Sequence, residues 1–540
     1  MAGCISVTFP GCRRYSVSVC SPFVFLPPIL APVISTVLTW AVQRRLASIE
    51  HIRQHPHEAQ AQVFQSLVHT ARNTAWGRQY GYADAPSARE FAQRVPISSY
   101  EQLYPQIERV LRGETDVLWP GRVEWFAKSS GTTNARSKYI PVTRESLHDC
   151  HYRAGRDTTA LATLYYPEID VLGGKTLSLG GTHGPNPFRP DEATSRVGDV
   201  SAVIMQNLPA WAEYVRTPPL ELALLDEWEE KIERIARHVL EADVRVLAGV
   251  PTWMIVLLRR VLELAGTTSI LDVWPQLGLF LHGAVAFGPY RELFRQLIPG
   301  PQMHYLEVYN ASEGYIALQD EPDSKDLLLL LNHGIYYEFL PADQWDAAEP
   351  RAIPLEQVEL GRTYALIIST NAGLWRYAIG DTVRFTSLAP YRIRVAGRTK
   401  HFLNAFGEEV VVENADAAIA AACRATNTTV RDYTAAPIYF ASHDGASRGG
   451  HQWLIEFNQT TVDLPHFTEV LDQTLRQLNS DYDAKRHRDL ALTPPVVTVA
   501  PAGTFEQWLA RRGKLGGQHK VPRLSNSREL LDEILDQLNN

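Results

Sequence analysis

The sequence predicts an α/β protein with a large N-terminal domain of several mixed sheets and packed helices, followed by a smaller α+β domain. At 540 residues the chain exceeds the size of one ordinary domain. Helical patterns and short apolar strands are mixed along most of it, as in α/β folds. The strand pattern restarts after about Gly397. We therefore expect an N-terminal extension at 1–42, a large domain at 43–396 and a small, mobile domain at 397–540.

Composition narrows the class of protein further. Apolar residues make up 45% of the chain and charged residues 21%, as in globular enzymes. The formal net charge of −8 and the lack of a lysine or arginine block give no support to a nucleic-acid partner. The five cysteines form no CxxC pair, so the sequence indicates neither a zinc site nor a disulfide framework. A reducing, cytoplasmic compartment fits this cysteine usage best.

The first 42 residues differ from the rest. Arg13 and Arg14 precede a largely apolar stretch at 15–42, which four prolines interrupt. The stretch superficially resembles a signal peptide or membrane anchor, but the prolines argue against a regular spanning helix, and no clear small-residue cleavage site follows. We interpret 1–42 as a disordered extension or as upstream sequence translated from a start codon chosen too early. A membrane anchor is the alternative.

The apolar pattern predicts the order of helices and strands along the rest of the chain. Apolar residues at four-residue steps predict helix from Leu46 onward, and a further helix should end at Leu111. A glycine-rich run at 173–190 is typical of a strand and a long loop. Helices are then expected at 228–240 and 252–264, and both should pack in the core. Strands are expected at 277–281, 305–309, 327–331, 335–340 and 363–369 in the large domain, and at 410–412, 437–441, 452–457 and 496–500 in the small one. The small domain should also contain a helix at 464–478 and a C-terminal helix at 530–538.

The stretch 126–143, FAKSSGTTNARSKYIPVT, has the residues that a polyphosphate site requires. Glycine lets the backbone approach the ligand, N–H groups and hydroxyls donate to anionic oxygens, and the cations Arg136, Lys138 and Arg144 offset the charge. The spacing does not match GxxxxGK[ST], so this is not an ordinary P-loop. A plain Ser/Thr/Gly-rich surface loop is the alternative.

Two later motifs favour nucleotide chemistry. In 305–314, YLEVYNASEG, a strand should deliver Tyr309 into a turn that bears Glu313. An aromatic face there can stack on a purine, and a carboxylate beside a phosphate can hold Mg²⁺. In 375–385, WRYAIGDTVRF, a tight turn should present Asp381 to the hydroxyls of a ribose. Each residue also has a purely structural interpretation: Tyr309 as a core residue, Glu313 as a helix-start residue and Asp381 as a turn former.

In this order the three motifs resemble those of the adenylate-forming enzymes, the superfamily of acyl-CoA synthetases, luciferases and peptide-synthetase adenylation domains. SSGTT followed by KYIPVT, together with VYNASEG, YYEFLP and YAIGD, is specifically similar to the auxin-responsive acyl acid–amido synthetases and their bacterial relatives. The resemblance covers nearly everything from about Leu46 to the end.

The resemblance implies a role for individual positions. Tyr309 would lie against the adenine, Ser312 would touch the α-phosphate, Glu313 would bind Mg²⁺ and Asp381 would hold the ribose. The β- and γ-phosphates of ATP would be held by Ser129, Ser130, Gly131, Thr132 and Thr133. Among these residues, Thr132 and Glu313 would be catalytic.

Further positions are implied outside the three motifs. His282 and Gly283 occupy the place of a small-residue turn beside the purine. Arg398 and Lys400 resemble the hinge between the domains. Lys520, in a Lys-Val-Pro-Arg segment, would be the catalytic mobile-domain lysine near the α-phosphate, with Lys514 as the alternative.

The sequence departs from the family pattern in two places. Asn134 and Ala135 stand where relatives often continue with another glycine, and no arginine follows Tyr377. The sequence leaves open whether Arg376, which precedes that tyrosine, takes the place of the missing arginine.

The implied activity is that of an ATP- and Mg²⁺-dependent ligase, which forms an acyl adenylate and passes the acyl group to an amine, with an amino acid as the expected acceptor. Coenzyme A as acceptor and a non-catalytic relative that binds nucleotide or acid are the alternatives. The acid should bind between 147 and 218, where Tyr165, Tyr166 and Trp211 permit an aryl or indolyl group. We expect a monomer without a membrane partner.

Overall fold

A computed structural model describes residues 39–40, 42–129, 138–209, 211–285, 287–345, 347, 349–398, 402–439, 449–459, 461–486, 492–512 and 521–539. Most of the N-terminal extension predicted at 1–42 lies outside these residues. In the part of the chain that is described, no helix is both long and apolar enough to cross a membrane.

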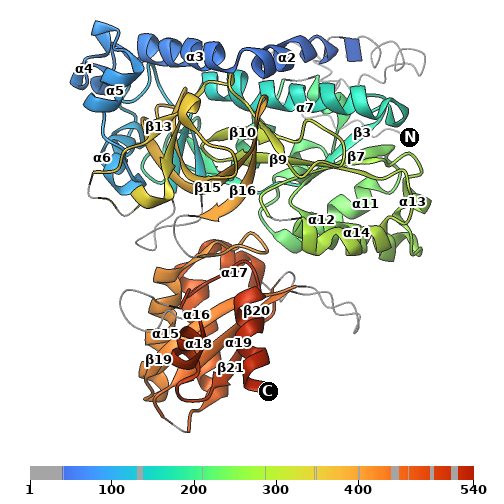
Figure 1. Ribbon diagram of the computed structural model, residues 1–540. Helices are drawn as coiled ribbons and strands as arrows, with labels where there is room; N and C mark the ends of the chain where they lie inside the picture. The colour runs from blue at the N-terminus through green and yellow to red at the C-terminus, as the bar shows by residue number, and fades with distance from the viewer. Residues whose placement is uncertain are drawn as a thin grey trace, which may run out of the picture.

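Helices predicted from Leu46 onward form one side of the large domain (Figure 1). Helix α2 (Leu46–Gln54) ends just before Pro56, which is the first residue of α3 (Pro56–Ala71), where a proline is tolerated. The face of α3 that carries Phe64, Leu67 and Val68 is buried. Helix α7 (Tyr152–Tyr165) runs beside α2.

The helix predicted to end at Leu111 is preceded by a separate helix. After α4 (Ala75–Gln79), α5 (Ala88–Arg94) and α6 (Tyr100–Leu111) are divided at 95–99. Each begins with a capping box, in which a serine and the Glu or Gln three residues later bond to each other's backbone N–H. These local signals, at Ser87 and Ser99, start two helices.

A twelve-stranded sheet forms the centre of the large domain. Its strands, in spatial order, are β13 (Ile353–Pro354), β12 (Ile335–Pro341), β14 (Thr363–Thr370), β15 (Tyr377–Leu388), β16 (Tyr391–Arg398), β11 (Leu327–Leu329), β10 (Gly314–Leu318), β9 (His304–Ala311), β8 (Leu279–His282), β7 (Val244–Gly249), β3 (Lys175–Ser178) and β6 (Arg216–Thr217). The strands from β13 to β9 pair antiparallel, and those from β9 to β6 pair parallel. The five strands predicted between 277 and 369 are confirmed as β8, β9, β11, β12 and β14.

The parallel part of the sheet is packed against helices, as parallel sheets require. The predicted helices at 228–240 and 252–264 are confirmed as α11 (Trp228–Val239) and α12 (Pro251–Ala265). Figure 1 shows them with α14 (Arg291–Leu297) at this end of the domain. Shorter helices complete it, namely α8 (Val200–Gln206), α9 (Ala212–Val215), α10 (Leu220–Ala223) and α13 (Ile270–Val273).

A separate four-stranded sheet brackets the predicted phosphate loop. Its order is β2 (Lys138–Val142), β1 (Trp125–Ser129), β5 (Arg196–Gly198) and β4 (His183–Pro185). Strands β1 and β2 pair antiparallel, with Ser129 opposite Lys138. Residues 130–137, between these two partners, lie outside the described part of the chain.

The C-terminal segment forms a smaller α+β unit, which Figure 1 shows below the large domain. Strands β19 (Val430–Ile438), β20 (Gly450–Phe457) and β21 (Val496–Ala500) form a sheet, and β17 (Phe402–Leu403) pairs with β18 (Val410–Val411). Its helices are α15 (Val412–Thr426), α16 (Leu464–Leu478), α17 (Ser480–Arg486), α18 (Thr504–Arg511) and α19 (Glu529–Asn539). The predicted domain boundary falls within β16, and its position at 396/397 stays a prediction.

The two domains touch through buried contacts. The Tyr290 hydroxyl donates to the Ala405 carbonyl, and the Thr252 hydroxyl donates to the Phe406 carbonyl at 3.5 Å. Side chains of both domains share one apolar cluster. The small domain is therefore docked on the large one in this conformation.

Candidate active site

A cavity of about 1210 Å³ lies beside the carboxyl ends of the parallel strands β3, β7, β8 and β9. Residues at or just after these strand ends line it, namely Ser178, Gly249, Gly283 and Ala311. Ligands of open α/β sheets bind at this edge, where the loops that leave the strands form a crevice. The volume exceeds the roughly 300–1,000 Å³ of a pocket for one small ligand. The cavity therefore has room for more than one substrate.

The structure brings together predicted site residues from distant parts of the sequence. The cavity is lined by Ser129, Gly283, Tyr309, Ser312, Glu313 and Asp381. Ser129 ends β1, Tyr309 lies in β9, and Asp381 lies in β15. Their roles toward ATP stay predictions, but their convergence on one cavity is a feature of the fold.

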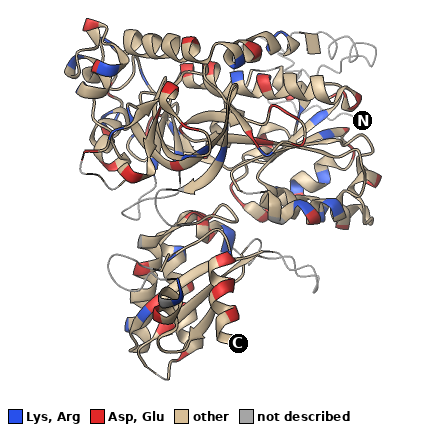
Figure 2. Cartoon of the chain, in the orientation of Figure 1, with Lys and Arg blue, Asp and Glu red and all other residues tan. Residues whose placement is uncertain are grey.

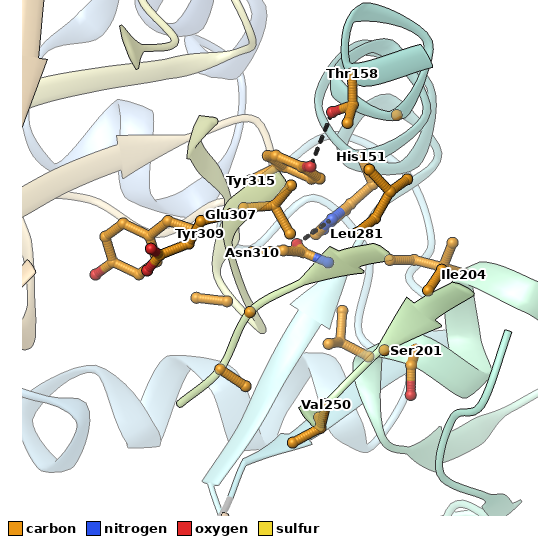
Figure 3. Close-up of a pocket in the computed structure, with 18 of the residues that line it drawn as sticks. His151, Thr158, Ser201, Ile204, Val250, Leu281, Glu307, Tyr309, Asn310 and Tyr315 are labelled. Atoms are coloured by element: carbon orange, nitrogen blue, oxygen red, sulfur yellow. Dashed lines mark hydrogen bonds between the residues drawn. The ribbon is translucent and has the colours of Figure 1, made fainter. Parts of the chain in front are cut away.

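Tyr309 and Asp381 contact each other directly. The Tyr309 hydroxyl donates a hydrogen bond to the Asp381 carboxylate, and both side chains face the cavity. Figure 3 shows the Tyr309 ring extending into the cavity from the end of β9. A phenol that donates to a carboxylate fixes the orientation of both groups.

The prediction that Asp381 lies in a tight turn is wrong, because the residue lies within strand β15. Three residues of β15, 379–381, lie opposite the single Leu366 of β14, which makes a bulge. Gly380 has a φ of +93°, a backbone conformation that favours glycine. A bulge redirects side chains, and here it lets Asp381 face the cavity from a strand.

Ser312 and Glu313 form the turn of the β9–β10 hairpin, in which Ala311 pairs with Gly314. This agrees with the turn predicted after Tyr309. Glu313 is only 8% exposed, although it carries a carboxylate and lines the cavity. Gly314 has a φ of +157°, a conformation that other residues rarely adopt, and a Cβ atom there would also meet Ile335 Cδ1 at 2.6 Å, so glycine is favoured after Glu313.

A histidine that the sequence analysis did not select lies behind this hairpin. The Nδ1 atom of His151 and the Oδ1 atom of Asn310 are 3.1 Å apart and form a hydrogen bond (Figure 3). Burial lowers the pKa of His151 to about 4, so the ring is neutral and donates through Nδ1. His151 thus orients Asn310 at the end of β9. No spacing rule joins residues 151 and 310, so sequence reasoning missed the pair.

His282 and Gly283 end strand β8 beside the cavity. The His282 ring is 2% exposed and stacks on Phe287 with the ring centroids 4.1 Å apart. Burial, with Arg291 nearby, lowers its pKa to about 3, so the ring is neutral. A Cβ atom on Gly283 would meet the Val308 carbonyl oxygen at 2.3 Å, which explains a glycine there. Gly283 lines the cavity, whereas the His282 ring packs beneath it.

Other predicted site residues lie outside the described part of the chain. This holds for Ser130, Gly131, Thr132, Thr133, Lys400, Lys514 and Lys520. For Arg398 the structure describes the backbone, which ends β16 opposite Asp381. The roles of these residues stay predictions.

One side of the cavity is largely apolar, and part of it comes from the region 147–218 that was predicted to bind the acid. Figure 3 shows Ile204, Val250 and Leu281 around it. Other lining residues of this side are Ala162, Val171, Leu172, Leu179, Leu208, Trp211, Ala212, Val215 and Val246. Among the polar residues there, Thr158 hydrogen-bonds to Tyr315 at 3.0 Å (Figure 3). An apolar wall of this kind fits the hydrophobic body of an organic acid.

Two of the three aromatic residues suggested for that pocket lie elsewhere. The Tyr165 hydroxyl donates to the Asp320 carbonyl at 2.9 Å. Tyr166 stacks on His304 with the centroids 4.0 Å apart. Trp211 does line the cavity. Helix periodicity could not separate the residues of α7 that face the cavity from those that face the neighbouring strands.

Comparisons with known proteins decide the family. The GH3 family N-terminal, central and C-terminal domain models match residues 45–303, 328–398 and 413–529, together most of the chain. The chain belongs to the GH3 family. The predicted resemblance to acyl acid–amido synthetases is therefore confirmed.

Curated GH3 relatives span nearly the same length as this chain. The indole-3-acetic acid-amido synthetase GH3.4 of Arabidopsis thaliana is 24% identical over 89% of this chain and 91% of its own length. The indole-3-acetic acid-amido synthetase GH3.8 of Oryza sativa subsp. indica is 24% identical over 89% and 90%.

Solved structures confirm the adenylate-forming fold. A GH3.15 acyl acid amido synthetase in complex with 2,4-DB superposes with a TM-score of 0.59 at 18% identity, covering 92% of this chain and 96% of that one. A 2-hydroxyisobutyryl-CoA ligase has a TM-score of 0.50 at 12% identity, covering 98% and 99%.

Proposed function

We propose that this GH3 protein activates a carboxylic acid with ATP and joins it to an amino acid through an amide bond. The observation that carries the proposal is the convergence of Tyr309, Glu313 and Asp381 on one cavity at the end of a parallel sheet. The protein is an ATP-dependent, AMP-forming ligase, as its family membership indicates.

The nucleotide is assigned to the polar side of the cavity. Asp381 accepts from the ribose hydroxyls, and the Tyr309 ring lies against the adenine. Ser129 and the loop 130–133 donate to the phosphates, and Ser312 donates to the α-phosphate. The hydrogen bond from Tyr309 to Asp381 holds the two nucleoside contacts in one arrangement.

Mg²⁺ is assigned to Glu313. The described residues contain no group of three or more His, Cys, Asp or Glu side chains that could hold a metal by themselves. This donor set fits Mg²⁺ bound to nucleotide, which needs only one or two protein carboxylates in addition to phosphate oxygens. The ion would neutralise the phosphate charge, and Glu313 would orient it from the rigid hairpin turn.

Positioning explains how these residues promote the reaction. A carboxylate is a poor acyl donor because its leaving group would be oxide. Attack of a carboxylate oxygen on the α-phosphate releases pyrophosphate and gives an acyl adenylate whose leaving group is AMP. The protein holds the reactants in line and stabilises the developing charge, so it needs no nucleophile of its own. Lys520 is proposed as the small-domain cation beside the α-phosphate.

The acid is assigned to the apolar side of the cavity. The relatives are named for indole-3-acetic acid, and the GH3.15 structure contains 2,4-DB. The wall formed by Ile204, Leu208 and Trp211 fits the body of an aryl or indolyl acid. We propose this class of acid for the chain, with a small-molecule acid and an amino acid as its partners.

Pyrophosphate release with a panel of aryl, indolyl and fatty acids tests the proposal. Each acid is supplied with amino acids, with coenzyme A, or with neither. We expect release that rises with amino acids and an amide product by mass spectrometry. Glu313→Ala should abolish release. Lys520→Ala should slow release by at least about a hundredfold. Lys514→Ala is the matched control, and the same loss in that variant instead would assign the role to Lys514.

The same assay can overturn the proposal. Release that rises only with coenzyme A would identify a thioester-forming ligase. Release from Glu313→Ala at the wild-type rate would remove its role toward Mg²⁺. No release with any acid, despite ATP binding, would favour a non-catalytic relative.

A further inference from the structure

Helix α17 of the small domain carries two charged residues that face the large-domain cavity. Asp481 and Lys485 are four positions apart, which places them on the same side of the helix, and both line the cavity. Two other residues of the helix point elsewhere, since Asp483 pairs with Arg476, and Arg486 pairs with Asp472. The cavity-facing side of α17 is therefore distinct from the rest of the helix.

Lys485 is a buried cation at the domain interface. Its side chain is 7% exposed, and its ammonium nitrogen lies 4.1 Å from the centre of a Trp253 ring in the large domain. A Cβ atom on Gly407 would lie 3.5 Å from Lys485 Cε, so the lysine is enclosed from both domains. Among the described residues, no hydrogen bond or close ion pair of this ammonium is seen, and Asp481, Asp199 and Glu408 attract it over a longer range. Burial lowers its pKa.

Carboxylates from both domains face the same space. Asp199, which precedes α8 in the large domain, lines the cavity and accepts from the Thr182 N–H at 3.0 Å. Asp481 and Glu409 line the cavity from the small domain. Asp481 also interacts with Lys485, Glu409, Asp199 and Lys128. Burial raises the pKa of Asp481 to about 7.

Side chains of both signs of charge thus line the same cavity as the residues of the predicted nucleotide site. Lys128 immediately precedes Ser129, so the charged group borders the proposed phosphate loop. The side of the cavity that is assigned to the organic acid is, in contrast, largely apolar. Figure 2 shows that basic and acidic residues are interspersed on both domains, so a general field of one sign does not account for the cluster.

We propose that the α17 face is the subsite of the acceptor amino acid, in which Lys485 binds the carboxylate and Asp481 and Asp199 bind the ammonium. This inference rests on the proposed amide-forming function. A zwitterion carries its two charges one carbon apart, and it matches a cation and carboxylates that lie close together. The carboxylate would give the buried Lys485 ammonium a directly bonded acceptor in addition to the longer-range attraction of Asp481, Asp199 and Glu408. An amine without a carboxylate would leave Lys485 without this bonded partner.

The subsite exists only when the small domain is docked as in this structure. Asp199 and Trp253 belong to the large domain, whereas Asp481 and Lys485 belong to the small one. A domain rotation would separate these pairs and dismantle the subsite. Binding of the amino acid would therefore favour the docked arrangement.

Competition between an amino acid and its decarboxylated amine tests the subsite. The best acid of the panel is combined with each of the twenty amino acids, and the best acceptor is then compared with the amine that lacks its carboxyl group. We expect wild type to prefer the amino acid by about a hundredfold in kcat/KM, the scale of a charge-assisted contact in a buried site. Lys485→Met, which keeps the length without the charge, should reduce this preference to about tenfold or less.

Two further variants make the test independent of folding. Asp481→Asn should raise the KM for both the amino acid and the amine, because it removes an ammonium contact and not a carboxylate contact. Asp483→Asn, on the opposite side of the same helix, is the matched control and should keep the wild-type preference. Thermal unfolding of each variant confirms that it is folded.

The possible results distinguish a failure of the proposed amide-forming function from a failure of the proposed amino-acid subsite. Absence of acid-dependent pyrophosphate release from wild type would overturn the proposed function itself. Amide formation by wild type with an equal preference for the amine would overturn the subsite alone. An unchanged preference in folded Lys485→Met would also overturn it.

Discussion

At the scale of single residues, the hydrogen bond from Tyr309 to Asp381 is the contact on which the proposed nucleotide site most depends. Both side chains line the cavity, and Asp381 is 9% exposed. A buried carboxylate is retained where it has partners that stabilise its charge. The tyrosine supplies one such partner, and ribose hydroxyls would supply others.

Replacing Asp381 by asparagine should raise the KM for ATP by about ten- to a hundredfold, because an ionic hydrogen bond to the ribose becomes a neutral one. Tyr309→Phe keeps the ring and should have a smaller effect, of about tenfold. Acid-dependent exchange of pyrophosphate into ATP measures both values. Tyr165→Phe is the matched control, because its hydroxyl bonds to the Asp320 carbonyl away from the cavity. An unchanged KM in Asp381→Asn would remove the residue from the ribose site.

Arg376 shows how a single residue can be conspicuous in sequence and yet structural. Its guanidinium pairs with both oxygens of Glu338, at 2.8 and 2.9 Å, and donates to the carbonyls of Ala92 and Val95. It is 5% exposed. Arg376 therefore joins β12 and the start of β15 to the end of α5, and it is not among the residues that line the cavity.

At the scale of elements, helix α11 supports the glycine-containing segment that borders the cavity. Lys231 of α11 is 1% exposed, and its ammonium donates to the carbonyls of Gly180 and Gly181 at 2.8 and 3.1 Å. Burial lowers its pKa to about 8, against the attraction of Asp199 and Asp226. The helix thus holds the backbone beside the apolar side of the cavity. Burying the charge of Lys231 destabilises the folded state in return.

This burial predicts a pH-dependent stability. The unfolded state holds the Lys231 proton up to the ordinary pKa of 10.5, whereas the folded state loses it near pH 8. Between these values the unfolded state binds more protons, so the contribution of Lys231 to the free energy of unfolding rises with pH, and below pH 8 the cost of burying the charge is present in full. Relative to Lys231→Met, wild type should gain about 2 kcal/mol between pH 8 and pH 10.

Urea unfolding at the two pH values measures this difference. Comparison with the variant removes the titration of all other groups, provided that they are independent of Lys231. Lys325→Met, at an exposed lysine, is the control and should show no comparable gain. A wild-type advantage that stays constant or falls with pH would contradict the prediction.

At the scale of the whole molecule, the docked position of the small domain decides which residues face the cavity. Glu408 accepts from the N–H groups of Ala405 and Phe406 and bonds to His451 at 2.8 Å, which stiffens the segment that meets the large domain. Tyr290 and Thr252 then bond to the carbonyls of this same segment. Burial together with Glu408 and Tyr439 raises the pKa of Tyr290 well above its usual value, so the phenol stays a donor.

Tyr290→Phe should shift the small domain away from the docked arrangement by about five- to tenfold, since the Ala405 carbonyl would lose its partner there. Small-angle scattering should show a larger radius of gyration, and the rate of amide formation should fall. Tyr364→Phe, whose hydroxyl bonds within the large domain, is the control. Scattering identical to wild type, with an unchanged rate of amide formation, would show that this contact does not hold the domains together.

The sequence by itself determined the class of fold, several long helices and central strands, and the motifs by which the family could be recognised. These depend on neighbours a few positions apart: a 3.6-residue apolar period for α11 and α12, and a strand followed by a turn at Tyr309 and Glu313. Family motifs are likewise local, so the family could be recognised before the fold was known.

Only the tertiary structure decided which side chains meet. The bulge at 379–381 turns Asp381 toward Tyr309, His151 reaches Asn310, and α17 presents Asp481 and Lys485 to a cavity of the other domain. Tyr165 and Tyr166 lie away from the cavity, although Thr158, Thr159 and Ala162 of α7 line it. Such outcomes depend on strand register, on bulges and on the docking of one domain against another. These are set by contacts between residues far apart in the chain, which local patterns do not encode.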